Sequence, residues 1–210
     1  MVQRVVVFVD YQNVYRRARD AFGLHGSFVD GQVDPLSVGH LLASAEEDHE
    51  LVGVRVYRGM PSPNRDPVGH AATQRQIARW RESSLVTVKT RSLNYRDQGA
   101  PQEKGIDVQI AVDFVMLAMQ GFYDVGILFS ADSDLHPAVE AVGTTAGSSA
   151  VRLASWWDRR LGGPRVVKAE NQVVFTHVLR RADYDAVHDP TNYAIGVGRK
   201  PRPPRRDAGA

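Results

Sequence analysis

Short apolar runs alternate with amphipathic stretches along most of the chain. The apolar runs are rich in β-branched residues, which is typical of strands that are buried on both faces of a parallel sheet. These runs cover residues 5–9, 51–59, 85–93, 124–135 and 149–155, and the fourth of them ends in a cluster of acids. The stretches between them have the spacing of helices and cover residues 11–22, 36–48, 71–83, 103–120 and 136–147.

This alternation of strands and helices predicts the α/β class. The expected architecture is a three-layer α/β/α sandwich around a mainly parallel central sheet, with right-handed crossovers. After Trp156 the pattern weakens, and residues 173–187 predict either a short strand or a short helix. We therefore predict one domain over residues 1–185, followed by a basic, proline-rich and disordered tail over residues 186–210.

Composition narrows the possible classes of protein. With 210 residues and 43% hydrophobic content, the chain has enough material for one well-packed domain. It contains no cysteine, which excludes a disulfide framework and a thiolate metal site. The first residues do not form a signal sequence, and no apolar run is long enough to cross a bilayer, so we expect a cytoplasmic protein without a membrane partner.

The charge of the chain is unevenly distributed. The net charge is +2, but residues 197–210 carry five basic residues and one acid, a charge of +4, which leaves −2 for residues 1–196. The tail could contact a phosphate backbone, and a solvated tail with no role is an equal alternative. The folded part is not expected to have a broadly basic surface.

The first strand ends in a charge, in the sequence FVDYQN. Asp10 follows the apolar run directly, and Asn13 lies three residues later. An aspartate at this place can cap the helix that follows, because its side chain accepts a hydrogen bond from a free N–H group of the first turn. The carboxyl ends of parallel strands are also where such sheets bind ligands. Asp10 alone does not decide between capping and function.

Three more acids point to the same edge of the sheet. Asp132 and Asp134 follow the strand that ends at Phe129, and in a doubly wound sheet this strand lies beside the first one. Asp107 lies in the first turn of the helix between them, where a carboxylate is also favoured by the helix dipole. Carboxylates that converge repel one another unless a cation lies among them, and oxygen ligands suit Mg²⁺ or Mn²⁺. The pattern therefore predicts a metal site.

Two nearby residues have no single interpretation. Asp113 lies six residues after Asp107, about 240° around a helix, so its side chain points away from that of Asp107. It either contacts the metal ligands without binding the ion or is simply exposed. His136 follows the acid cluster and either begins a helix or takes part in proton transfer.

The motifs FVDYQN, KGIDVQIAVDF and ILFSADSDL, in this order, resemble those of the NYN domain, a PIN-like ribonuclease group that includes the LabA-like proteins. The resemblance covers residues 4 to about 155. It implies a PIN-like fold with strand order 3-2-1-4-5 and cleavage of RNA that depends on Mg²⁺ or Mn²⁺. Carried over by position, it implies an acidic centre with an amide after the first acid, formed by Asp10, Asn13, Asp107, Asp132 and Asp134. The glycine that is common in the Ser-Gly-Asp-x-Asp pattern is Ala131 here.

Together these observations predict a metal-dependent ribonuclease. The four acids would hold one or two metal ions, and hydrolysis of the phosphodiester bond would leave a 5′-phosphate. Asn13 would position the water or the scissile phosphate, or it would only bond within the first turn of its helix. Ser130 and Lys104 would contact the phosphate, although an exposed lysine with no role is the simpler interpretation of Lys104.

Other functions and several details stay open. An RNA- or protein-binding module on the same fold, without catalysis, is the main alternative. A phosphatase of the haloacid dehalogenase type is less favoured, because Gln12 stands where that chemistry needs a second acid. The expected partner is single-stranded RNA, and the sequence does not tell whether the protein acts as a monomer or as a homodimer.

Overall fold

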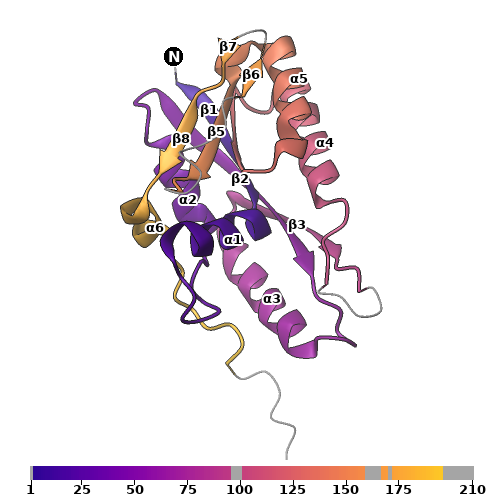
Figure 1. Cartoon of the computed structure of the whole chain (residues 1–210). Coiled ribbons are helices and arrows are strands. Elements are labelled where there is room, and N and C mark those ends of the chain that lie inside the picture. The colour runs from indigo at the N-terminus through magenta and orange to yellow at the C-terminus, as the bar shows by residue number, and fades with distance from the viewer. Residues whose placement is uncertain (1, 96–100, 159–166, 170–171, 196–210) are drawn as a thin grey trace, which may run out of the picture.

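Six parallel strands form one sheet at the centre of the molecule. The computed structural model describes residues 2–95, 101–158, 167–169 and 172–195. The sheet has the strand order β3-β2-β1-β4-β5-β8, and every neighbouring pair is parallel (Figure 1). Its strands are β1 (Gln3–Asp10), β2 (His49–Met60), β3 (Val86–Ser92), β4 (Val125–Phe129), β5 (Val151–Trp156) and β8 (Thr176–Leu179). A separate antiparallel pair is formed by β6 (Lys168–Ala169) and β7 (Gln172–Val173).

Helices cover both faces of the sheet, which gives three layers. The α-helices are α1 (Tyr11–Phe22), α2 (Pro35–Ala43), α3 (Pro67–Trp80), α4 (Ile106–Met119), α5 (His136–Ala146) and α6 (Arg181–Val187). Helices α1, α2, α3 and α6 share one buried cluster with the sheet, and α4 and α5 share the other (Figure 1). Two short 3-10 helices flank α5, η1 (Ser133–Leu135) and η2 (Ser148–Ala150). In the part of the chain that the structure describes, no helix combines the length and the apolar character needed to span a membrane.

The central position of β1 explains its sequence. Residues 5–10 are all buried, because helices cover both faces of this strand. The odd-numbered valines pack under α1 and α2, and Val6 and Phe8 pack under α4 and α5. Strand β4 pairs with β1 up to the contact between Val9 and Phe129. The residues that follow these two strands therefore meet at one edge of the sheet.

The predicted three-layer architecture and the order of the first five strands are confirmed. Residues 173–187, for which the sequence predicted either a strand or a helix, contain both, and β8 adds a sixth strand beside β5. Several predicted helix boundaries differ; α3 ends at Trp80 and not at residue 83, and α4 begins at Ile106 and not at residue 103. Helix α2 ends at Ala43 because residues 44–48 turn the chain into β2. Helix α3 begins at Pro67 because Asp66 caps it by accepting a hydrogen bond from the N–H of Gly69, and proline suits the first turn.

The described chain continues to pack against the domain beyond residue 185. The predicted boundary falls inside α6, which ends at Val187. After it, His188 forms an antiparallel bridge with Val33, and Arg75 Nη1 donates a hydrogen bond to the carbonyl oxygen of Tyr193 at 2.9 Å. The remainder of the predicted tail, residues 196–210, lies outside the described residues.

Candidate functional site

Asp10 lies where β1 ends and α1 begins. Its side chain is buried, and the residue is 7% exposed. Oδ1 accepts a hydrogen bond from the backbone N–H of Asn13 at 3.2 Å, and Oδ2 accepts one from Ser130 Oγ at 3.0 Å. The first bond caps α1, and the second links the carboxylate to the turn after β4. Asp10 is therefore both a helix cap and a member of a cluster at the carboxyl edge of the sheet.

The turn after β4 is held against α1 by further hydrogen bonds. The N–H of Ala131 donates to Asn13 Oδ1 at 3.0 Å, so the amide side chain joins the two strand ends. The N–H of Asp132 donates to Ser130 Oγ at 3.1 Å. Ser130 therefore connects Asp10 with Asp132, and the residues of both predicted motifs lie together.

These residues line a small cavity of about 280 Å³, which we call the acid cavity. Its lining combines four acids with two arginines and consists of Asp10, Gln12, Asn13, Arg16, Arg17, Asp20, Glu103 and Asp132. The pKa of Asp10 is raised to about 6, chiefly by burial and in part by the charges of Glu103 and Asp132, against the hydrogen bonds from Asn13 and Ser130. Crowded carboxylates of this kind favour either protonation or a bound cation.

Glu103 is an acid of this cavity that the sequence analysis did not identify. It precedes α4 and accepts a hydrogen bond from the backbone N–H of Gly59 in β2. Burial raises the pKa of Glu103, while the bond from Gly59 and the charges of Arg58 and Arg16 lower it. The one indication in the sequence is the position of Glu103 in the Glu-Lys-Gly segment that directly precedes α4. The contact with Gly59 spans 44 residues, so no local pattern could reveal it.

Asp107 and Asp134 are not among the residues that line the acid cavity. Asp107 is partly buried in the first turn of α4. Asp134 is exposed in η1, where its N–H donates to Asp132 Oδ1 at 3.0 Å. The structure thus brings Asp10 and Asp132 together, and the predicted role of Asp107 and Asp134 as metal ligands stays a prediction.

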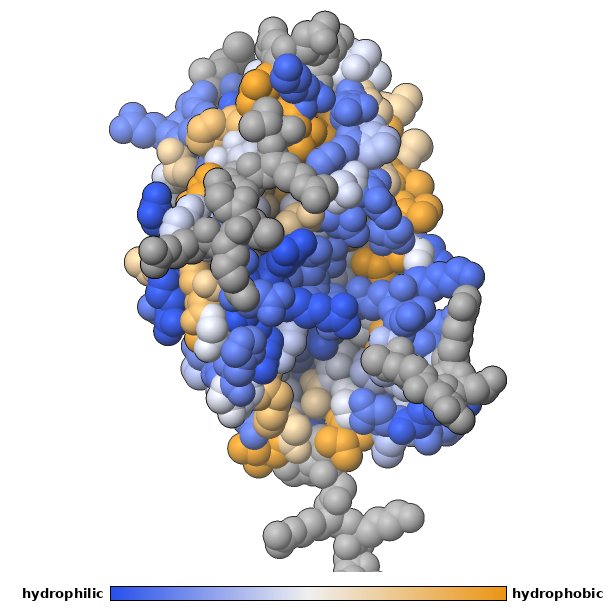
Figure 2. Space-filling model, viewed as in Figure 1, coloured by the Kyte–Doolittle hydropathy of each residue, from blue (hydrophilic) through white to orange (hydrophobic). Residues whose placement is uncertain are grey.

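Cations lie near the acid cavity. A cavity of about 470 Å³ between β3 and α4 is lined by Lys89, Thr90, Arg91, Ser92, Lys104, Ile106 and Gln109. Lys104, the predicted phosphate contact, therefore lies with two further cations, and it is the next residue after Glu103. Figure 2 shows hydrophilic side chains over the middle of the face that carries α1 and the ends of the neighbouring strands. This edge of the sheet therefore offers both anionic and cationic groups.

Asp113 belongs to the interior of the protein. It is 9% exposed, so the exposed position that the sequence left open is excluded. Tyr57 donates a hydrogen bond from its hydroxyl to Asp113 Oδ2 at 2.7 Å, and Lys89 Nζ donates to Oδ1 at 2.9 Å. These bonds lower the pKa of Asp113 against the effect of burial, which would raise it. The residue stabilises the contact of α4 with β2 and β3.

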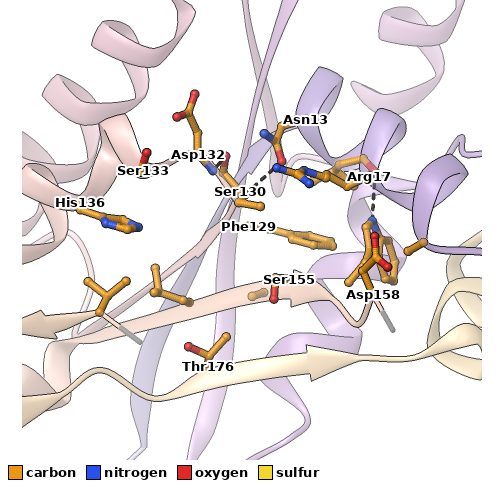
Figure 3. Close-up of a pocket in the computed structure, with 17 residues that line it drawn as sticks. Asn13, Arg17, Phe129, Ser130, Asp132, Ser133, His136, Ser155, Asp158 and Thr176 are labelled. Carbon is orange, nitrogen blue, oxygen red and sulfur yellow. Dashed lines mark hydrogen bonds between the residues drawn. The ribbon is translucent and has the colours of Figure 1, made fainter. Parts of the chain in front are cut away.

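A larger cavity of about 620 Å³, which we call the β5 cavity, adjoins the acid cavity. Both cavities are lined by Asn13, Arg17 and Asp132. His136, whose role the sequence left open, lines the β5 cavity. Figure 3 shows Arg17 and His136 on opposite sides of this cavity, with Thr176 below them.

A different group of metal-ligating side chains lies at the other end of the sheet. Ligand atoms of Glu46, Asp48 and His49 all lie within 4.8 Å of one another just where β2 begins. Glu46 also forms an ion pair with Arg152 Nε at 3.3 Å. Among the described residues, this is the group of three whose ligand atoms lie so close together. No three acids of the acid cavity have ligand atoms within 4.8 Å of one another.

Comparisons with known proteins agree with this arrangement. The model of the NYN domain family matches residues 4–157. Among solved structures, a protein of unknown function from Vibrio parahaemolyticus is similar, with 22% sequence identity and a TM-score of 0.50. The match covers 74% of this chain and 81% of that one, and at this identity it supports the fold alone. The comparison with curated protein sequences returned no match.

Proposed function

The chain belongs to the NYN domain family, and from this membership and the acid cavity we propose that it is a metal-dependent ribonuclease. The family is one of PIN-like nucleases. The observation that carries the proposal is the buried Asp10, whose carboxylate faces Ser130 and lies near the charges of Glu103 and Asp132. Single-stranded RNA as the substrate, Mg²⁺ or Mn²⁺ as the cofactor and a cytoplasmic location are parts of the same proposal.

The donors of the acid cavity fit a hard divalent cation. They are carboxylate oxygens, and the raised pKa of Asp10 means that its ionised form lacks sufficient compensation from the protein alone. Asp10, Asp132 and Glu103 would hold the ion, and Asp107 and Asp134 would complete the set of ligands from outside the lining. Such an ion lowers the pKa of water and stabilises negative charge on phosphoryl oxygens.

The protein's own side chains would place the RNA. Asn13 and Ser130 fix the relative position of the two strand ends through their hydrogen bonds, so they would keep the acids in register. Arg16 and Arg17 line the acid cavity and would attract the phosphate that is cleaved. Lys104 and its neighbours in the cavity beside α4 would contact the phosphates of the strand that leads away.

The test compares Asp10 and Asp132, which line the acid cavity, with Asp34, which caps a helix elsewhere. Asp34 caps α2 by accepting a hydrogen bond from the N–H of Ser37 at 2.8 Å, and it is not among the residues lining the acid cavity. Asp10→Asn and Asp132→Asn should each reduce Mn²⁺-dependent cleavage of single-stranded RNA by a factor of at least about 100, because each removes a charge that holds the ion. Asp34→Asn should keep the activity of the unaltered protein within about a factor of two.

Equal residual activity in all three variants and the unaltered protein would overturn the ribonuclease proposal. RNA binding without cleavage would then favour the alternative, a binding module on the same fold. The observation that favours this alternative is that no three acids of the acid cavity have ligand atoms within 4.8 Å of one another.

A further inference from the structure

The β5 cavity shares Asn13, Arg17 and Asp132 with the acid cavity, but the residues that line the rest of it have no part in the hydrolysis described above. It lies between the turn after β4, helix α1, the first turn of α5 and strands β5 and β8. Its volume of about 620 Å³ is within the range of roughly 300–1,000 Å³ that is typical of sites for small organic ligands. The space is therefore large enough for one nucleotide.

The lining of the β5 cavity combines apolar walls with a few polar groups. Val14, Leu153 and Val167 supply apolar surface, and Thr176 supplies a hydroxyl group. Ser155 Oγ, also in the lining, is shielded from solvent and has no hydrogen-bond partner among the described residues. An unpaired buried hydroxyl destabilises the folded protein, and a ligand with a donor or an acceptor would remove this cost. This combination is suited to a flat, partly polar molecule such as a nucleobase.

The position of the β5 cavity indicates which nucleotide of the RNA would supply the base. Because Asn13, Arg17 and Asp132 line both cavities, an RNA strand with a phosphate in the acid cavity has its neighbouring nucleotide at the mouth of the β5 cavity. Proteins that recognise single-stranded RNA commonly bind bases that are turned out of the stack. We propose that the β5 cavity binds the base of the nucleotide next to the cleaved bond, with Arg17 at its phosphate. The inference rests on the proposed function and names a part of its substrate.

The first experiment measures the contribution of the base directly. Calorimetric titration of the unaltered protein in Mg²⁺ would compare the four nucleoside 5′-monophosphates with ribose 5-phosphate, which has the same phosphate and sugar. We expect at least one nucleotide to bind at least about tenfold more tightly than ribose 5-phosphate, because contact with one base is worth about that much. Equal affinities for all five compounds would overturn the proposal.

The second experiment fills the cavity. Ser155→Leu and Thr176→Leu should each bring the affinity for the nucleotide down to that for ribose 5-phosphate, without changing the latter. The matched control is Thr87→Leu, since Thr87 is an exposed threonine in β3, at the opposite edge of the sheet, and should keep the tenfold ratio. Circular dichroism would verify folding, and Thr176→Leu carries the test if Ser155→Leu does not fold. An unchanged ratio in a folded Leu variant would overturn the proposal.

The two proposals can fail separately. Cleavage that depends on Asp10, combined with no preference for a nucleotide over ribose 5-phosphate, overturns the base site and leaves the ribonuclease. Preferential nucleotide binding that the Leu variants remove, combined with no cleavage of any RNA, supports the base site and overturns only the hydrolysis.

Discussion

Asp10 has two roles that oppose each other in the folded protein. Its carboxylate caps α1 and anchors the turn after β4, yet it is buried beside other acids. The rise of its pKa from 3.8 to about 6 corresponds to about 3 kcal/mol of stability lost when the group is ionised. If this position served only to cap α1, an uncharged asparagine would cap the helix equally well and would avoid this loss of stability.

This opposition predicts that Asp10→Asn stabilises the metal-free protein in a pH-dependent manner. Between pH 3.8 and about 6 the folded protein holds a proton at Asp10 that the unfolded chain has lost, so its stability falls as the pH rises through this window. The variant has no charge at this position. It should therefore exceed the unaltered protein by up to about 3 kcal/mol at about pH 8 and by little at about pH 4.

Urea unfolding in EDTA at the two pH values would measure this difference. Asp34→Asn is the control, because Asp34 is another capping aspartate and is not in the acid cavity. A gain of the same size at both pH values, or a loss at about pH 8, would contradict the assigned origin of the raised pKa.

At the scale of elements, the sequence predicted the strands and helices whose formation depends on the local pattern of apolar and polar residues. The runs at residues 5–9 and 124–135 predicted two central strands, because strands covered on both faces must be apolar throughout, and both strands exist as β1 and β4. Strand β4 ends at Phe129, before the acids that the predicted run included. The end of α2 was misjudged because residues 44–48 have helical propensity, and only the need to enter β2 ends the helix earlier. The position of Glu103 and the burial of Asp113 depend on contacts between distant segments, which a single sequence does not encode locally.

The contact between β2 and α4 gives a prediction at this scale. Tyr57 is fully buried, and its hydroxyl group donates to the buried Asp113. Tyr57→Phe would remove this donor and leave the carboxylate with the bonds from Lys89 and Gln109. We expect a loss of about 1–3 kcal/mol in the free energy of unfolding, because a buried acceptor loses a partner.

A double-mutant cycle with Asp113→Asn would test whether this loss belongs to the pair. Groups in direct contact typically show a coupling energy of about 0.5–3 kcal/mol. Additive effects of the two substitutions would contradict the contact as the source of the stability.

At the scale of the whole molecule, the sheet has two ends that could bind a cation. The acid cavity lies at its carboxyl end, and the group of Glu46, Asp48 and His49 lies where β2 begins. A cation that binds only the folded state stabilises it, by about 2.7 kcal/mol when its concentration is about 100 times the dissociation constant. We expect Mn²⁺ to raise the melting temperature of the unaltered protein and of Glu46→Gln equally, and to leave that of Asp10→Asn unchanged. Loss of the shift in Glu46→Gln alone would assign the ion to the other end of the sheet.

The basic residues of the chain's last segment give the final prediction. Residues 197–210 carry a charge of +4, whereas residues 1–196 carry −2, so this segment is the main source of net positive charge. Deleting it should weaken binding of single-stranded RNA most at low salt, because contacts with phosphates release counterions.

For single strands the slope of log K against log salt changes by about 0.7 for each phosphate contact, so loss of the five basic residues should reduce the slope by up to about 3.5. Binding would be measured with Asp10→Asn, in which RNA stays intact, and cleavage with the unaltered active site at saturating RNA. We expect cleavage at saturation to persist after the deletion, because the acids and arginines of the acid cavity belong to the folded domain. An unchanged salt slope would show that the segment does not contact RNA, and loss of cleavage at saturating RNA would show that it contributes to the chemical step itself.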